Sequence, residues 1–100
     1  MTEPTQKRSD KDHRRQITPD QLNNAIDETI NLLMWRLNED KGWGAWLSRH
    51  EISGFLTEEY DEVKAAVHNG SFAEIKCELM DVAVGCIFAT ACINAETMDW

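Results

Sequence analysis

The sequence predicts an all-α protein, folded as a helical bundle, and three observations support this prediction. Apolar residues return every three or four positions in three long segments, which is the spacing of one helix face. Each of these segments opens on a helix N-cap signal. No segment alternates apolar and polar residues as a half-buried strand does. One hundred residues fit one domain, which we expect at residues 17–100, after a tail at residues 1–16.

The tail and the body of the chain differ in charge. Residues 1–16 hold almost no apolar side chain and half of the 10 Lys and Arg residues, so we expect a flexible basic tail. Such a tail can contact nucleic acid or an acidic partner, although a solvated tail is the commoner case. Residues 17–100 hold 15 of the 18 acidic residues and only 5 of the basic ones. A nucleic-acid-binding surface is therefore not expected on the body.

The first helix is expected from residue 19 to residue 39. Thr18 is an N-cap, Pro19 suits the first helical position, and Gln21 completes a capping box. The residues 38–42 (NEDKG) end the segment. Its apolar stripe consists of Leu22, Ile26, Ile30, Leu33 and Leu37.

Two further helices follow, each with a predicted capping box. Ser48 and Glu51 open the second helix, and Asn69-Gly70 is a natural C-terminal stop. Ser71 and Glu74 open the third helix, which is apolar nearly all round after Asp81. A helix of that kind is buried on most sides, and three helices cannot cover it alone. We therefore expect the core to be completed by oligomerisation, as a homodimer or a tetramer. Close helix contact at such an interface would explain Gly54 and Gly85 inside helices, although chance would also explain them.

The cysteines and the apolar runs indicate in which cellular compartment the protein is expected and whether it enters a membrane. Cys77, Cys86 and Cys92 are odd in number and lack C-x-x-C spacing, which predicts buried free thiols in a reducing compartment. The longest apolar run, residues 82–93, is about 12 residues long and too short to span a bilayer. With no visible signal peptide, we expect a cytoplasmic protein that does not enter a membrane.

Four carboxylates predict a metal site. Glu59 and Glu62 lie three residues apart, as do Glu78 and Asp81, so each pair projects from one side of its helix. Antiparallel packing of the two helices would bring all four together, and two carboxylates at about 5 Å repel by roughly 3 kcal/mol at an effective dielectric near 20. A hard divalent cation removes that repulsion, so we expect Mg²⁺, with Mn²⁺ as a substitute. A solvated helix face is the commoner origin of such charges, but these acids adjoin apolar segments, and the nearby helical bases are only Lys64 and Lys76.

These residues resemble a known family. Glu58-Glu59-Tyr60-Asp61-Glu62 and Glu78-Leu79-Met80-Asp81 resemble the E-E-x-x-E and E-x-x-D signature of the MazG-like all-α nucleoside triphosphate pyrophosphohydrolases. The segment 41–46 (KGWGAW) is similar to the basic-x-Trp-x-x-aromatic segment of the branch that includes the dCTP pyrophosphatases. The likeness covers about residues 20–95.

The resemblance implies hydrolysis of a nucleoside triphosphate to the monophosphate and pyrophosphate. It implies that Glu59, Glu62, Glu78 and Asp81 bind Mg²⁺, while Glu58 orients or deprotonates the attacking water or binds a further metal ion. Trp43 and Trp46 are candidates to stack on the base, because aromatic faces bind bases, or else they fill the gap between the first two helices. Lys41 and Lys64, with Arg36 and Arg49, are the bases available for phosphate.

The chain departs from the family pattern in two places. No Lys or Arg follows Lys76, although the family usually continues into a helix with basic residues, and Met80 stands where glycine is common. Two alternatives therefore stay open: a non-catalytic acidic interaction module that retains the fold, and an enzyme for another phosphate substrate, such as a phosphoribosyl nucleotide. Zinc is not expected, because the separation of His50 and His68 fits no usual ligand spacing.

Overall fold

The computed structural model describes residues 14–99, which form helices and loops without a strand in that range. This confirms the predicted all-α class. Residues 1–13 of the expected tail, and Trp100, lie outside the described residues.

Helix α2 spans Pro19–Trp35 and begins at the predicted capping box. The Gln21 N–H donates to Thr18 Oγ1 at 3.1 Å, and the Thr18 N–H donates to Gln21 Oε1 at 3.0 Å. The helix continues without a break into η1, a π-helical segment at Arg36–Asp40, where the Lys41 N–H donates to the Arg36 carbonyl at 2.6 Å. Gly42 follows with a φ of 84°, a left-handed conformation that favours glycine. The helix therefore ends where its sequence predicts, but its last turn is wider than expected.

Helix α3 spans Arg49–Asn69, and its predicted capping box is wrong. Ser48 occupies the N-cap position, but its side chain makes no capping hydrogen bond. The Glu51 carboxylate instead accepts from the Leu47 N–H at 2.6 Å, one residue further back. The acid thus secures the preceding loop rather than the N-cap.

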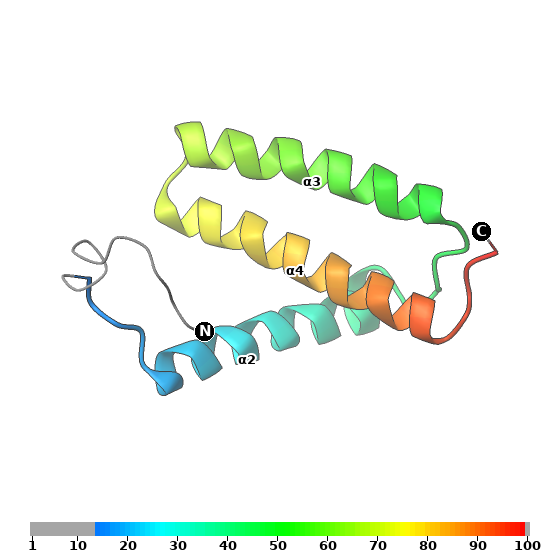
Figure 1. Cartoon of the computed structure of the whole chain (residues 1–100), viewed down its shortest axis with the longest axis horizontal. Coiled ribbons are helices and arrows are strands. Elements are labelled where there is room, and N and C mark those ends of the chain that lie inside the picture. The colour runs from blue at the N-terminus through cyan, green and yellow to red at the C-terminus, as the bar shows by residue number, and fades with distance from the viewer. Residues whose placement is uncertain (1–13, 100) are drawn as a thin grey trace, which may run out of the picture.

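Helix α4 spans Phe72–Asn94 and opens on the capping box that the sequence predicts. The Ser71 N–H donates to Glu74 Oε1 at 2.7 Å, and the Glu74 N–H donates to Ser71 Oγ at 3.2 Å. Figure 1 shows α4 antiparallel to α3 and lying between α3 and α2. Within the described range, α4 packs on both other helices, whereas α2 and α3 do not pack on each other. Helix α4 is therefore the centre of the bundle.

One glycine explains how closely α3 and α4 approach. A Cβ built at Gly85 would overlap the ring of Phe55, so this close contact lies within the chain. A Cβ at Gly54 would meet nothing within 4 Å. The close contact at Gly85 is therefore made by α3 and α4 of one chain, and the interface contact expected at the two glycines stays a prediction.

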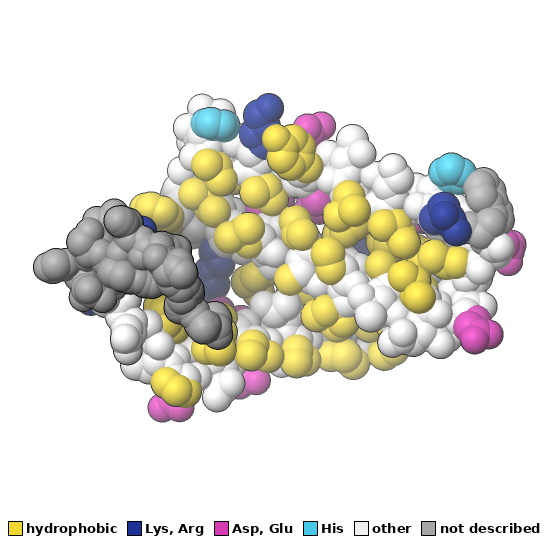
Figure 2. Space-filling view, viewed as in Figure 1, with side chains coloured by type: hydrophobic (Ala, Val, Ile, Leu, Met, Phe, Trp, Pro, Cys, Tyr) yellow, Lys and Arg dark blue, Asp and Glu magenta, His cyan; other side chains and the backbone are white. Residues whose placement is uncertain are grey.

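The core of the single chain is small. Among the described residues, the buried apolar side chains are Leu37, Val84, Ala89 and Cys92. Figure 2 shows hydrophobic side chains gathered over α4 and along α2, on the face turned to the viewer. Large exposed side chains include Leu22, Ile26, Ile30, Met34, Leu79 and Ile87. The chain alone therefore does not cover α4 on most sides.

This incomplete cover corrects one prediction about the cysteines. All three are free thiols, but only Cys92 is buried, and Cys77 and Cys86 are exposed. Their burial was predicted from the apolar character of the segment. That argument fails because no other part of the described chain covers the outer side of α4.

The apolar run of residues 82–93 lies within a helix that is longer than the run itself. Helix α4 has 23 residues and a mean hydropathy of 1.5 in its most apolar window, so by length and composition alone it could cross a membrane. Core helices of soluble proteins pass the same test, so this property does not by itself assign α4 to a membrane.

Candidate metal centre

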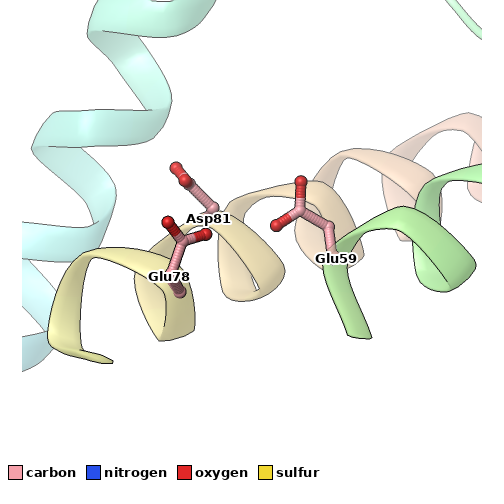
Figure 3. A group of neighbouring side chains, drawn as sticks. All are labelled: Glu59, Glu78 and Asp81. Carbon is pink, nitrogen blue, oxygen red and sulfur yellow. The ribbon is translucent and has the colours of Figure 1, made fainter. Parts of the chain in front are cut away.

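Three of the four predicted carboxylates meet between α3 and α4. The tight connection at residues 70–71 turns the chain back on itself, so that Glu59 of α3 faces Glu78 and Asp81 of α4. One carboxylate oxygen from each residue lies within 4.8 Å of the others. Figure 3 shows the three side chains pointing toward one common space. The i, i+3 spacing places two acids on one side of α4, and antiparallel packing brings the third.

Two oxygen atoms of this group lack partners. Glu59 Oε1 and Glu78 Oε1 are buried, and neither has a hydrogen-bond partner among the described residues. A buried acceptor without a donor costs about 1–3 kcal/mol, and more when it is charged. The three-acid group, Glu59, Glu78 and Asp81, therefore has ligand atoms that a cation could satisfy.

The pKa values of the group also favour a bound cation. Burial, followed by repulsion from Glu62, Asp81, Glu78 and Glu58, raises the pKa of Glu59 from 4.5 to about 7. Burial is also the largest cause that raises the pKa of Glu78, followed by the charge of Glu62, while Arg36 opposes the shift. Without a cation, the group resists full ionisation.

The remaining two acids of the predicted site lie at its edge. Glu62 is exposed and does not belong to the three-acid group, but it interacts with the carboxyl group of Glu78. Glu58 is exposed and lines the cleft beside Glu59. Neither residue is placed as an inner ligand of the group, and both remain close enough to act on it.

Arg36 brings a positive charge directly into the site. Its Nη2 donates to Asp81 Oδ1 at 2.6 Å, across a sequence separation of 45 residues. Its Nε lies 3.9 Å from Asp40 Oδ2 and is buried without a hydrogen-bond acceptor in the described chain. Sequence reasoning included Arg36 among the bases available for phosphate but missed this ion pair. The available signal was that Arg36 is the only basic residue in the segment 17–40.

A cleft of about 410 Å³ adjoins the three-acid group. Its volume lies within the range of roughly 300–1,000 Å³ that is typical of small-molecule sites. Acidic, basic and aromatic side chains all contribute to its lining. Those that bear on chemistry are Arg36, Lys41, Glu58, Glu59, Asp81, Trp46, Phe55 and Phe88.

The two predicted base-contacting tryptophans differ in position. Trp46 lines the cleft, with ring centroids 5.6 Å from Phe55 and 5.7 Å from Phe88, so it also fills the space between helices. Trp43 is 61% exposed and does not line the cleft, and its Nε1 donates to Asn38 Oδ1 at 2.8 Å. The structure therefore brings Trp46, and not Trp43, into the cleft that Glu58, Glu59 and Asp81 also line.

The two predicted lysines differ in the same way. Lys41 lines the cleft at the end of η1. Lys64 is exposed, does not line the cleft, and has its Nζ 5.8 Å from the centroid of the Tyr60 ring. Arg36 and Lys41 are thus the basic side chains that the cleft brings close to the three-acid group.

No family model matches this chain, and no curated protein or solved structure is significantly similar to it. The likeness to the MazG-like enzymes therefore rests on the motif residues alone.

Proposed function

We propose that this chain is a Mg²⁺-dependent nucleoside triphosphate pyrophosphohydrolase of the MazG-like type, active in control of the nucleotide pool. One observation carries the proposal. Three carboxylates with oxygens within 4.8 Å of one another stand beside a cleft lined by two cations and three aromatic rings. A divalent metal, a polyphosphate and a flat base each find complementary groups there.

The donor set suits Mg²⁺. The group offers only oxygen ligands, which this hard cation prefers, and two of its oxygens are buried without a partner in the described residues. Glu59, Glu78 and Asp81 would hold the ion, and Glu62 lies close enough to Glu78 to take part. Mn²⁺ suits the same ligands. When bound, the metal would supply charge neutralisation and a more acidic water for phosphoryl transfer.

The chain's own residues have separate tasks in this reaction. Glu58 is exposed at the cleft, where its carboxylate can orient the attacking water and accept its proton. The water oxygen bonds to the α-phosphorus, the bond from that phosphorus to the α,β-bridging oxygen breaks, and pyrophosphate leaves. Arg36 and Lys41 would donate to phosphate oxygens, and Trp46 would contact the base.

We also propose that the active form is a homodimer or a tetramer. Ile26 and Ile30 of α2 are each 45% exposed, and Leu79 and Ile87 of α4 are 54% and 44% exposed. Apolar faces of this kind mark association sites, and a second copy would cover them. Light scattering on the eluted protein tests this directly, and a stable monomer would contradict it. A cytoplasmic location belongs to the same proposal, because free thiols persist in a reducing compartment.

The deciding experiment is a product assay over ribo- and deoxyribonucleoside triphosphates, in Mg²⁺, in Mn²⁺ and in EDTA. The proposal requires metal-dependent release of pyrophosphate and of the nucleoside monophosphate. Glu78→Gln and Asp81→Asn should each abolish both Mg²⁺ binding and turnover, while Asp61→Asn, an exposed acid on α3, serves as the matched control. Release of single phosphate would refute the reaction. Turnover confined to a phosphoribosyl nucleotide would retain the chemistry and change the substrate.

A second candidate is a non-catalytic acidic module that assembles through its apolar faces. The Arg36–Asp81 ion pair favours it, because that pair already neutralises one acid of the group without a metal. In this case the protein would assemble normally, bind no Mg²⁺ in calorimetry and hydrolyse no nucleotide.

A further inference from the structure

Arg36 and the predicted metal would compete for the same carboxylate. We propose that Arg36 is an exchangeable counter-ion: it neutralises Asp81 in the metal-free protein and is transferred to a substrate phosphate when Mg²⁺ takes Asp81. This inference rests on the proposed function and deepens it. In this inference, Arg36 weakens the binding of Mg²⁺ alone and strengthens the binding of phosphate once Mg²⁺ is bound.

The first half follows from the contact between Arg36 and Asp81. The Nη2–Oδ1 distance is 2.6 Å, and the side chains are 29% and 21% exposed, so solvent screens the pair only in part. Hydrogen bonds between ionised partners are about twice as strong as neutral ones. A metal that approaches Asp81 therefore meets both an occupied oxygen and a positive charge.

The second half follows from the donors that Arg36 leaves unused. A guanidinium carries five N–H donors, and Arg36 uses one of them on Asp81. Its Nε is buried and has no acceptor in the described chain, since Asp40 Oδ2 at 3.9 Å is beyond hydrogen-bond distance. Arg36 also lines the cleft together with Lys41. A phosphate in that cleft would offer the two parallel acceptors that guanidinium binds best.

The backbone of Arg36 is held by hydrogen bonds at both its N–H and its carbonyl. Its N–H donates to the carbonyls of Leu32 and Leu33, and its own carbonyl accepts from the Lys41 N–H. These bonds place Arg36 where α2 becomes the π-helical η1. Such π turns are frequent at functional sites. In the proposed exchange the guanidinium group moves while this backbone stays in place.

The test compares Arg36→Gln with wild type and with Lys76→Gln in the full chain. Lys76→Gln removes the same charge from an ion pair with Glu28, at 2.9 Å, that does not line the cleft. Calorimetry would first measure binding of magnesium chloride alone. We expect Arg36→Gln to bind Mg²⁺ at least about tenfold more tightly than wild type, and Lys76→Gln to change it by less than about threefold.

The second titration uses inorganic pyrophosphate in saturating Mg²⁺. In this titration we expect the substitution to lower affinity instead of raising it. Arg36→Gln should bind pyrophosphate at least about tenfold more weakly than wild type, while Lys76→Gln should match wild type. Arg36→Lys keeps the charge without the planar fork and should recover only part of the pyrophosphate affinity. Circular dichroism of each variant establishes that the helices are intact.

The outcomes separate this inference from the proposed function. Unchanged or weaker Mg²⁺ binding by Arg36→Gln, or unchanged pyrophosphate binding, overturns the exchange even if wild type hydrolyses nucleotides. Opposite changes in the two titrations support the exchange even if wild type hydrolyses none, which would refute the enzyme alone. If neither wild type nor Arg36→Gln binds Mg²⁺, both are refuted.

Discussion

Glu59→Gln should stabilise the metal-free protein at alkaline pH and have little effect in acid. Glu59 is a partly buried carboxyl group with a pKa raised from 4.5 to about 7, chiefly by burial and then by neighbouring acids. The folded chain therefore keeps a proton on Glu59 over a pH range in which the unfolded chain has lost it. The stability that this proton contributes is complete below about pH 4.5 and is lost as the pH rises through about 7.

The size of the effect follows from the shift. The difference of about 2.5 pKa units corresponds to about 3 kcal/mol at 1.36 kcal/mol per unit, so forced ionisation of Glu59 lowers the free energy of unfolding by at most that amount. Glutamine is nearly isosteric and has no charge to lose. We therefore expect Glu59→Gln to exceed wild type by about 1–3 kcal/mol near pH 8 and by less than about 1 kcal/mol near pH 5.

Urea unfolding in EDTA, at one fixed protein concentration and at both pH values, measures this difference. Asp61→Asn is the matched control, because it removes one exposed acid from the same helix without entering the three-acid group. Saturating Mg²⁺ should then reverse the order, since wild type gains the binding free energy and Glu59→Gln does not. Equal stability of wild type and Glu59→Gln near pH 8 would refute the electrostatic account of the site.

Three further predictions concern packing, the cleft and assembly. Gly85→Ala should lower the free energy of unfolding by about 1–3 kcal/mol in urea titrations, because its methyl group would overlap an aromatic ring, whereas Gly54→Ala should raise it by about 0.5–1 kcal/mol. Trp46→Leu should weaken binding of a non-hydrolysable nucleotide by about tenfold in calorimetry, and Trp43→Leu by less than about threefold, since only the former ring lines the cleft. Ile26→Asp should shift the molar mass in light scattering to that of a monomer, because the substitution places a charge on the exposed apolar face of α2.

The features of the fold that could be predicted from the sequence are those that depend on residues close together along the chain. The capping boxes at Thr18 and Ser71 depend on side chains three residues apart, and both form. The box expected at Ser48 does not form, because Glu51 has a competing donor in the Leu47 N–H. A spacing rule identifies which groups can meet, but it cannot rank a donor three residues away along the chain against one four residues away.

In the candidate site, too, contacts set by helical spacing could be predicted, and contacts set by the packing of distant helices could not. Pairing of Glu78 with Asp81 needed only helical periodicity, and the approach of Glu59 needed only one antiparallel turn. The Arg36–Asp81 ion pair joins residues 45 positions apart, so it depends on how α2 crosses α4. The exposure of Cys86 could likewise not be predicted from the sequence, because it depends on which side of α4 another helix covers.

In the loop between η1 and α3, the backbone of Trp46 and Leu47 is as fully hydrogen-bonded as the backbone inside a helix. The N–H groups of Trp46 and Leu47 donate to Cys92 Sγ at 3.4 Å and Glu51 Oε1 at 2.6 Å. Their carbonyls accept from Thr97 Oγ1 at 2.9 Å and the Asp99 N–H at 2.7 Å. All four backbone polar groups of this dipeptide are therefore satisfied outside any helix. In hydrogen exchange, these two loop amides should be protected like helical ones, which would make the wall of the cleft a rigid surface that a ligand finds already formed.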